Sequence, residues 1–221
     1  MSVPSSTESP APAQRLTRAS LAAAVQALSA QDPSLAAIVA RHGTPPLWAR
    51  PAGFATLGRI VLEQQVSLEA AATLWRRLDA QIPGGFHAAP VAEIGVDALR
   101  ALGLTRQKSA YLHGLATAVA DRTLDLALLA RASDAEVMSR LTALHGIGPW
   151  TASVYLLFAL RRPDVWPPGD LALHLAMRDA HGWPKPPASP DATRHAERWA
   201  PWRAAAARIL WHGYLRERGR G

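Results

Sequence analysis

Helical periodicity is the feature of this sequence that most restricts its fold. Apolar side chains recur every three to four residues from Ser20 to Arg216, while alternating runs of β-branched residues are scarce. Prolines follow Asp32 and Gly148, at first helical positions where a missing N–H costs nothing. The pattern predicts an all-α fold of about twelve helices. The expected helices are residues 20–30, 33–42, 53–64, 68–81, 96–102, 106–120, 124–130, 134–144, 149–160, 171–180, 192–200 and 202–216.

Charge is the second constraint, because the 221 residues include 24 Lys plus Arg against 17 Asp plus Glu, a net charge of +7. Only Lys108 and Lys185 are lysines, so nearly all of the positive charge is guanidinium. Arginine suits phosphate groups because its planar fork of donors matches paired oxygens. A coding sequence rich in G and C would also favour arginine, so the charge permits nucleic-acid binding without establishing it.

The absence of cysteine excludes several classes of function. Disulfides, thiol nucleophiles, cysteine-ligated zinc and an iron–sulfur cluster are ruled out, and such a chain suits the reducing cytoplasm. The longest mainly apolar stretch, residues 150–160, is too short to cross a bilayer, so we expect no membrane partner. Residues 1–14 carry no secretory signal, and their richness in Pro, Ser and Ala predicts a disordered tail.

The stretch LTALHGIGPWTA, residues 141–152, predicts a helical hairpin. Gly146 and Gly148 separate two helix-forming segments, and both can adopt positive φ and allow another backbone to approach closely. The second helix, starting at Pro149, would expose unpaired N–H groups and the positive end of its dipole. Such a site suits a phosphate diester. An ordinary tight turn between packed helices is the alternative reading of a short glycine motif.

Four ordered segments carry a wider pattern. They are GRIVLEQQVSLEAAATLWRRL (58–78), LGLTRQKSAYLHGLA (102–116), the hairpin followed by DVWPPGDLAL (141–173), and ERWAPWRAAAARILW (197–211). Together they resemble the helix-hairpin-helix (HhH-GPD) DNA glycosylase superfamily, most closely the bacterial 3-methyladenine DNA glycosylase II group. The resemblance implies two helical lobes with an active-site cleft between them.

The same resemblance sets the expected division of the chain. Residues 15–221 would form one glycosylase fold, with residues 52–163 as the hairpin-containing lobe. Residues 15–51 and 164–221 would form the second lobe. We expect the N-terminal β-rich domain of the best-known relative to be missing, because about 50 residues precede the first matching segment, fewer than a typical domain needs.

By resemblance, Asp170 is the catalytic carboxylate, delivered by the rigid approach of residues 167–169. Breaking an N-glycosidic bond develops positive charge on the deoxyribose, which a fixed carboxylate stabilises. The same group could orient or deprotonate the attacking water. The alternative is that Asp170 merely caps the helix that follows, and the two roles are compatible. Asp164 is the nearest competitor, but it lies before the proline turn.

Residue 150 indicates the type of enzyme. Members of the superfamily with strand-cleaving lyase activity have a lysine here, whereas this chain has Trp150, which cannot form a Schiff base. The resemblance places Trp150, Trp211 and Val154 around the flipped base, whose positive charge after alkylation attracts an indole face. Val154 replaces a tyrosine of the best-known relative. Core packing is the alternative for each tryptophan, since the chain has eight.

Two further roles follow from the resemblance. Gln65, or its neighbour Gln64, would enter the duplex as a wedge where the flipped nucleotide leaves a gap, although an exposed helix end explains both glutamines equally well. The hairpin would bind a monovalent cation, Na⁺ or K⁺. The backbone groups expected there are the carbonyls of Thr142, Leu144 and Ile147 around the ion, and the N–H groups of Gly146, Gly148 and Trp150 facing a DNA phosphate.

The resemblance thus implies a monofunctional, monomeric DNA glycosylase of the nucleoid that needs no cofactor. It would excise 3-methyladenine and related alkylpurines from double-stranded DNA. Three alternatives stay open. They are a glycosylase for oxidised or mismatched bases, a non-catalytic hairpin module that only grips DNA, and a helical protein-interaction domain whose basic charge is compositional.

Overall fold

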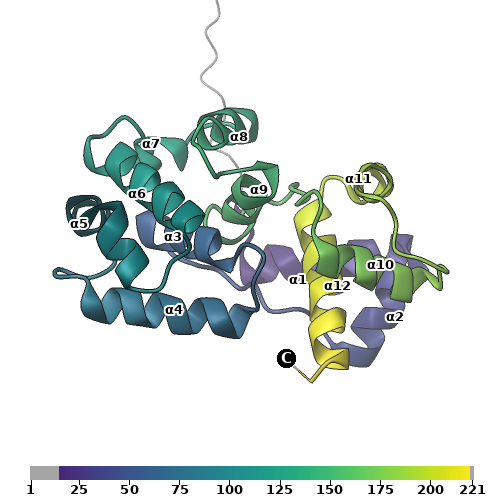
Figure 1. The fold of residues 1–221 in the computed structure, drawn as a ribbon. Helices are drawn as coiled ribbons and strands as arrows, with labels where there is room; N and C mark the ends of the chain where they lie inside the picture. The colour runs from purple at the N-terminus through teal and green to yellow at the C-terminus, as the bar shows by residue number, and fades with distance from the viewer. Residues whose placement is uncertain (1–14, 220–221) are drawn as a thin grey trace, which may run out of the picture.

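The computed structural model describes residues 15–219, apart from the side chain of Leu68, and the predicted disordered tail at 1–14 lies outside this range. The described residues form twelve α-helices and one short 3₁₀ helix, with no strand. The helices group into two lobes (Figure 1). The prediction of an all-α, two-lobed fold with a helical hairpin is confirmed. Within residues 15–219, no helix combines the length and apolarity that crossing a membrane requires.

One lobe consists of the helices α3 to α9. Their bounds are α3 Phe54–Glu63, α4 Leu68–Gln81, α5 Ala88–Ala101, α6 Arg106–Ala120, α7 Leu126–Leu129, α8 Asp134–Thr142 and α9 Pro149–Phe158. Apolar faces of α3, α6 and α9 form the centre of its core, where Ile60, Leu112 and Tyr155 are fully buried. Gly58 on α3 allows this packing, because a Cβ there would lie 3.0 Å from the ring of Phe86.

The other lobe combines both ends of the described chain. Its helices are α1 Arg18–Gln31, α2 Pro33–His42, α10 Leu171–His181, α11 Ser189–Ala196, the 3₁₀ helix Glu197–Trp199 and α12 Arg203–Glu217. A run of four alanines at the start of α12 is fully buried, which lets neighbouring elements approach closely. Trp199 fills the middle of this core and donates from Nε1 to Asp32 Oδ2 at 2.9 Å.

Phe158 and Arg208 join the two lobes. Phe158 packs against both cores, at the end of the helix α9. The fully buried guanidinium of Arg208 lies 5.6 Å from the Phe158 ring centre and donates to the carbonyls of Leu47, Leu157 and Ala204 at 2.7–3.0 Å. Burial lowers the pKa of Arg208 to about 9, so the side chain is still charged near neutral pH.

The structure differs from the expected helix bounds in two informative places. The helix α5 begins at Ala88, eight residues before the predicted start, and contains a kink at Gly95, where φ is +77°. The helix α8 ends at Thr142 rather than at residue 144. The hairpin turn therefore spans residues 143–148, long enough to direct several backbone groups outward.

Candidate active site

Asp170 lies where the two lobes meet, at the N-terminal cap of α10 and only 9% exposed. Its Oδ1 accepts from the backbone N–H of Leu173 at 2.9 Å and from Trp211 Nε1 at 3.1 Å. Its Oδ2 accepts from Trp150 Nε1 at 2.9 Å. Asp170 is thus a helix cap and is also held by one tryptophan from each lobe.

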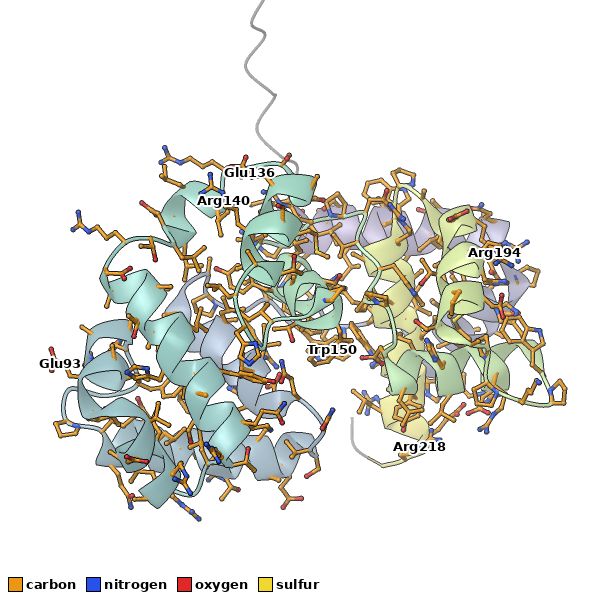
Figure 2. All side chains as sticks on the ribbon, turned by 45° about the horizontal axis from the view of Figure 1, so that its top comes forward. Glu93, Glu136, Arg140, Trp150, Arg194 and Arg218 are labelled. Atoms are coloured by element: carbon orange, nitrogen blue, oxygen red, sulfur yellow. The ribbon has the colours of Figure 1, made fainter. Side chains whose placement is uncertain are left out.

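These three donors leave the Asp170 carboxylate with spare accepting capacity. A carboxylate has about four lone-pair sites, two on each oxygen. Two donors occupy Oδ1, whereas Trp150 alone occupies Oδ2. Trp150 is half-buried, and Figure 2 shows it at the boundary between the lobes. The remaining site on Oδ2 can accept a proton from water or face a developing positive charge.

The predicted base pocket is only partly assembled. The indole N–H groups of Trp150 and Trp211 converge on Asp170. Trp211 is 8% exposed and stacks on Phe158 at 5.4 Å between ring centroids, so one of its faces is covered. Val154 is 2% exposed and belongs to the core of the lobe formed by α3 to α9, so it offers almost no surface to a base in this structure.

His174 and the competitor Asp164 differ from Asp170 in their charge environment. His174, one turn along α10, has a pKa lowered by burial, partly countered by the charge of Asp170, so the imidazole is neutral at pH 7. It therefore leaves the carboxylate charge uncompensated. The competitor Asp164 pairs with Arg203, whose Nε and Nη2 donate to its two oxygens at 2.7 and 2.9 Å. Asp164 is already neutralised, whereas Asp170 accepts only from uncharged donors.

The hairpin of α8 and α9 presents free backbone donors. Gly146 has φ of +87°, and a Cβ there would overlap the ring of Tyr111, so both its freedom and its size require glycine. Gly148 has φ of −89° and a Cβ there would meet nothing within 4 Å, so no steric demand of the fold explains it. The helix α9 has no side-chain cap, in contrast to α8, which Ser133 caps. Within the described residues, no acceptor pairs with the N–H groups of Gly146 or Gly148.

The predicted cation site has a suitable donor set. Thr142 ends α8, at the negative end of its dipole, and Leu144 and Ile147 follow in the turn. The Leu144 carbonyl accepts from the N–H of Ile147 at 3.1 Å, which leaves one of its lone pairs free. Uncharged carbonyl oxygens suit a hard monovalent ion.

The two predicted wedge residues differ in their surroundings. Gln65 is exposed and adopts a left-handed backbone with φ of +57°. Gln64 donates from Nε2 to the Gly146 carbonyl at 3.0 Å and to Thr151 Oγ1 at 2.8 Å, so its amide is engaged within the protein. The Gln64 backbone carbonyl accepts from Lys108 Nζ, a contact between distant helices that no sequence pattern indicates. Of the two glutamines, Gln65 is the one free to reach DNA.

A groove of about 1030 Å³ connects these elements. It runs between the loop that follows α3, the first turn of α6 and the hairpin turn. Its lining includes Gln65, Arg106, Lys108, His145 and Gly148. The groove thus brings the wedge residue and the unpaired hairpin N–H groups to one surface, together with the exposed guanidinium of Arg106.

Asp32, His181 and His195 form a second cluster of metal-ligand type in the described part of the chain, with ligand atoms within 4.8 Å of one another. Asp32 already caps α2 and accepts from Trp199. The guanidinium of Arg198 lies 3.5 Å from His195 Nε2, which disfavours a second cation. We therefore assign these residues to packing.

Residues 59–201 match the HhH-GPD superfamily of base excision DNA repair proteins. The chain belongs to this superfamily. The HhH-GPD chain is 33% identical over 156 residues to DNA-3-methyladenine glycosylase 1 of Schizosaccharomyces pombe. The aligned region covers 69% of this chain and 68% of that protein. It is 31% identical over 166 residues to DNA-3-methyladenine glycosylase 2 of Escherichia coli, covering 70% and 55%. The match thus leaves about a third to nearly half of these relatives unmatched.

Solved HhH-GPD structures share the fold. The S. pombe 3-methyladenine DNA glycosylase Mag1 in complex with abasic DNA aligns with a TM-score of 0.78 at 29% identity, covering 86% of this chain and 95% of that one. An 8-oxoguanine glycosylase/lyase of Clostridium acetobutylicum aligns with a TM-score of 0.76 at 16% identity, covering 90% and 70%. At that identity the second likeness concerns the fold alone.

Proposed function

We propose that this HhH-GPD protein is a monofunctional DNA glycosylase that hydrolyses alkylated bases, chiefly 3-methyladenine and related alkylpurines, from double-stranded DNA. The observation that carries the proposal is the buried Asp170 carboxylate, held by indole N–H groups from both lobes. The names of the two aligned relatives, both DNA-3-methyladenine glycosylases, support the substrate class. The protein acts as a monomer, because a single lesion in a duplex needs one copy. Its substrate places it at the nucleoid.

DNA binding begins at the hairpin. The N–H groups of Gly146, Gly148 and Trp150 face a backbone phosphate, assisted by the dipole of α9. The carbonyls of Thr142, Leu144 and Ile147 would hold a Na⁺ or K⁺ ion, which would supply a positive charge near that phosphate. Gln65 enters the stack as the damaged nucleotide leaves it, because a flipped base leaves a gap that must be filled.

The chemical step is hydrolysis at the sugar carbon C1′. The bond from C1′ to the base nitrogen breaks and its electron pair leaves with the base, which neutralises the positive charge of the alkylated ring. The Asp170 carboxylate stabilises the cationic sugar, and its free site on Oδ2 orients the water that attacks C1′. The water proton passes by way of the carboxylate to solvent. No acid is needed for the leaving group because the base is already cationic.

The products are a free base and an intact strand with an abasic site. Strand cleavage in this superfamily requires an amine nucleophile where this chain has Trp150, whose indole N–H instead donates to Asp170. With no cysteine in the chain, an iron–sulfur cluster has no ligands. The reaction uses water as its sole co-reactant.

Asp170→Asn tests the proposal, with Asp32→Asn as the matched control. Both aspartates cap a helix and accept from a tryptophan N–H, but Asp32 lies in the core of the second lobe. Removing the charge at Asp170 should lower release of 3-methyladenine and 7-methylguanine from alkylated genomic DNA by roughly 100-fold or more. DNA binding should persist, and Asp32→Asn should release bases at the normal rate once folded.

Other outcomes would favour the alternatives. Release of only an oxidised or mismatched base from a panel of lesion-bearing oligonucleotides would replace the substrate class. Unchanged release by Asp170→Asn would remove Asp170 as the catalytic group. Salt-sensitive DNA binding with no base release from any lesion would indicate a module that only grips DNA.

A further inference from the structure

The loop that follows α3 is hydrogen-bonded to a lysine on the helix α6. Lys108, in the first turn of α6, donates from Nζ to the carbonyls of Leu62 and Gln64 at 2.7 and 2.8 Å. These carbonyls stand at the C-terminal end of α3, where helical partners run out. A cation is favoured there because it faces the negative end of the helix dipole.

The same loop is also hydrogen-bonded to the hairpin. The Gln64 amide bridges the Gly146 carbonyl and the Thr151 hydroxyl, across the turn and the first turn of α9. One residue, Gln64, therefore accepts from Lys108 through its backbone and donates to the hairpin through its side chain. The loop that follows α3, the start of α6 and the hairpin form one continuous hydrogen-bonded unit.

This unit fixes an unusual conformation at the next residue. Gln65 has φ of +57°, in the left-handed region that residues with a Cβ rarely adopt. Its side chain and that of Val66, which is 45% exposed, project from the loop without burial to hold them. This backbone is held on one side by the contacts on Gln64, immediately before it, and on the other by Ser67, which caps α4.

We propose that Lys108 is a positioning residue that braces the loop containing Gln64 and Gln65 against the hairpin, so that the phosphate grip sets how Gln65 enters the base stack. The inference rests on the proposed function, which supplies the duplex and the flipped nucleotide. Burial lowers the pKa of Lys108, in keeping with an ammonium directed at protein carbonyls rather than at solvent. The alternative is that Lys108 binds a DNA phosphate directly.

The first test compares one lesion in two contexts. A 7-methylguanine in a fully paired duplex must be unstacked, whereas the same nucleotide in a single-nucleotide bulge is already without a partner. For Lys108→Met, the ratio of duplex to bulge excision rates should fall on the order of tenfold, because the variant loses help with extrusion and keeps the chemistry. Lys108→Arg should restore most of the ratio, and Lys185→Met should leave it unchanged. Equal losses on both substrates, or none, would overturn the proposal.

The second test separates positioning from phosphate binding. Arg106→Met, on the same groove, should reduce the slope of log affinity against log salt by about 0.9, as expected for one lost phosphate contact. Lys108→Met should leave this slope as in the wild type, because its ammonium is committed to carbonyls. A slope change equal to that of Arg106→Met would assign Lys108 to the phosphate instead.

A third measurement keeps the inference independent of catalysis. In an Asp170→Asn background, fluorescence of 2-aminopurine beside the lesion reports unstacking on binding, even if no base is released. Lys108→Met and Gln64→Met should both reduce this signal at saturating protein, and Gln64→Met carries the test if Lys108→Met does not fold. Full unstacking by both variants would contradict the brace. Absence of base release by the wild type would count against the proposed function alone.

Discussion

The indole N–H of Trp150 meets Oδ2 of Asp170 at 2.9 Å, although the two residues lie on different helices and 20 positions apart. The sequence suggested Trp150 as a surface on which the base stacks, whereas in the structure its indole N–H orients the carboxylate. Trp211 donates to the other oxygen from α12. The direction of the Asp170 carboxylate is thus fixed by the way the two lobes meet.

Trp150→Phe should separate the two roles of this residue. Phenylalanine keeps an aromatic face but removes the donor to Oδ2, and one hydrogen bond to a charged group contributes about 1.5–3 kcal/mol. We expect single-turnover base release to fall by roughly 10- to 100-fold with little change in DNA affinity. A phenylalanine variant as fast as the wild type would show that the ring alone matters.

The two hairpin glycines should respond differently to alanine. Gly146→Ala forces a Cβ into the Tyr111 ring at positive φ and should lower the free energy of unfolding by about 2 kcal/mol or more. Gly148→Ala meets nothing and should cost at most about 1 kcal/mol, as an N-cap replacement. Urea titration measures both effects.

Gly148→Ala should nevertheless weaken binding to duplex DNA, because its methyl group stands where the phosphate approaches the free N–H groups. Filter binding or anisotropy at fixed salt would measure the loss. Wild-type affinity in a folded Gly148→Ala protein would contradict the proposed phosphate site.

The histidines of the second lobe should make stability depend on pH. Burial lowers the pKa values of His174, His181 and His195, so the unfolded chain binds more protons than the native protein as the pH falls through about 6.5. The stability that these neutral imidazoles provide is present above that pH and is lost on acidification. The melting temperature should therefore fall between pH 7.5 and 5.5. Replacing His181 and His195 by glutamine should flatten this dependence, and an unchanged dependence would contradict it.

Helix bounds were predictable where the sequence contains its own boundary signals. The helices at 33–42, 68–81 and 106–120 match the prediction, because Asp32, Ser67 and Thr105 each cap the first turn. The first half of α5 was missed because it contains Pro90 and ends at Gly95, both of which favour a turn reading. Its packing against α6 overrides these local preferences.

The resemblance proposed individual site residues, but not the hydrogen-bond network that joins them. The resemblance identified Asp170, the hairpin glycines and the two tryptophans, yet it assigned indole faces where the structure uses indole N–H groups. Hydrogen bonds between distant helices leave no periodic signal. Lys108 was missed for this reason, because a lysine in the first turn of a helix normally reads as a solvated charge.

The guanidinium of Arg208 has a consequence for how lesions are found. To move the lobes apart, the protein would have to break the hydrogen bonds from Arg208 to the carbonyls of Leu47 and Leu157, beside the Phe158 ring. These contacts resist opening of the lobes, so we expect the duplex to deform more than the protein when a nucleotide is flipped. Selectivity would then depend on how easily each nucleotide unstacks and unpairs, so nucleotides in weakened base pairs would be flipped most readily.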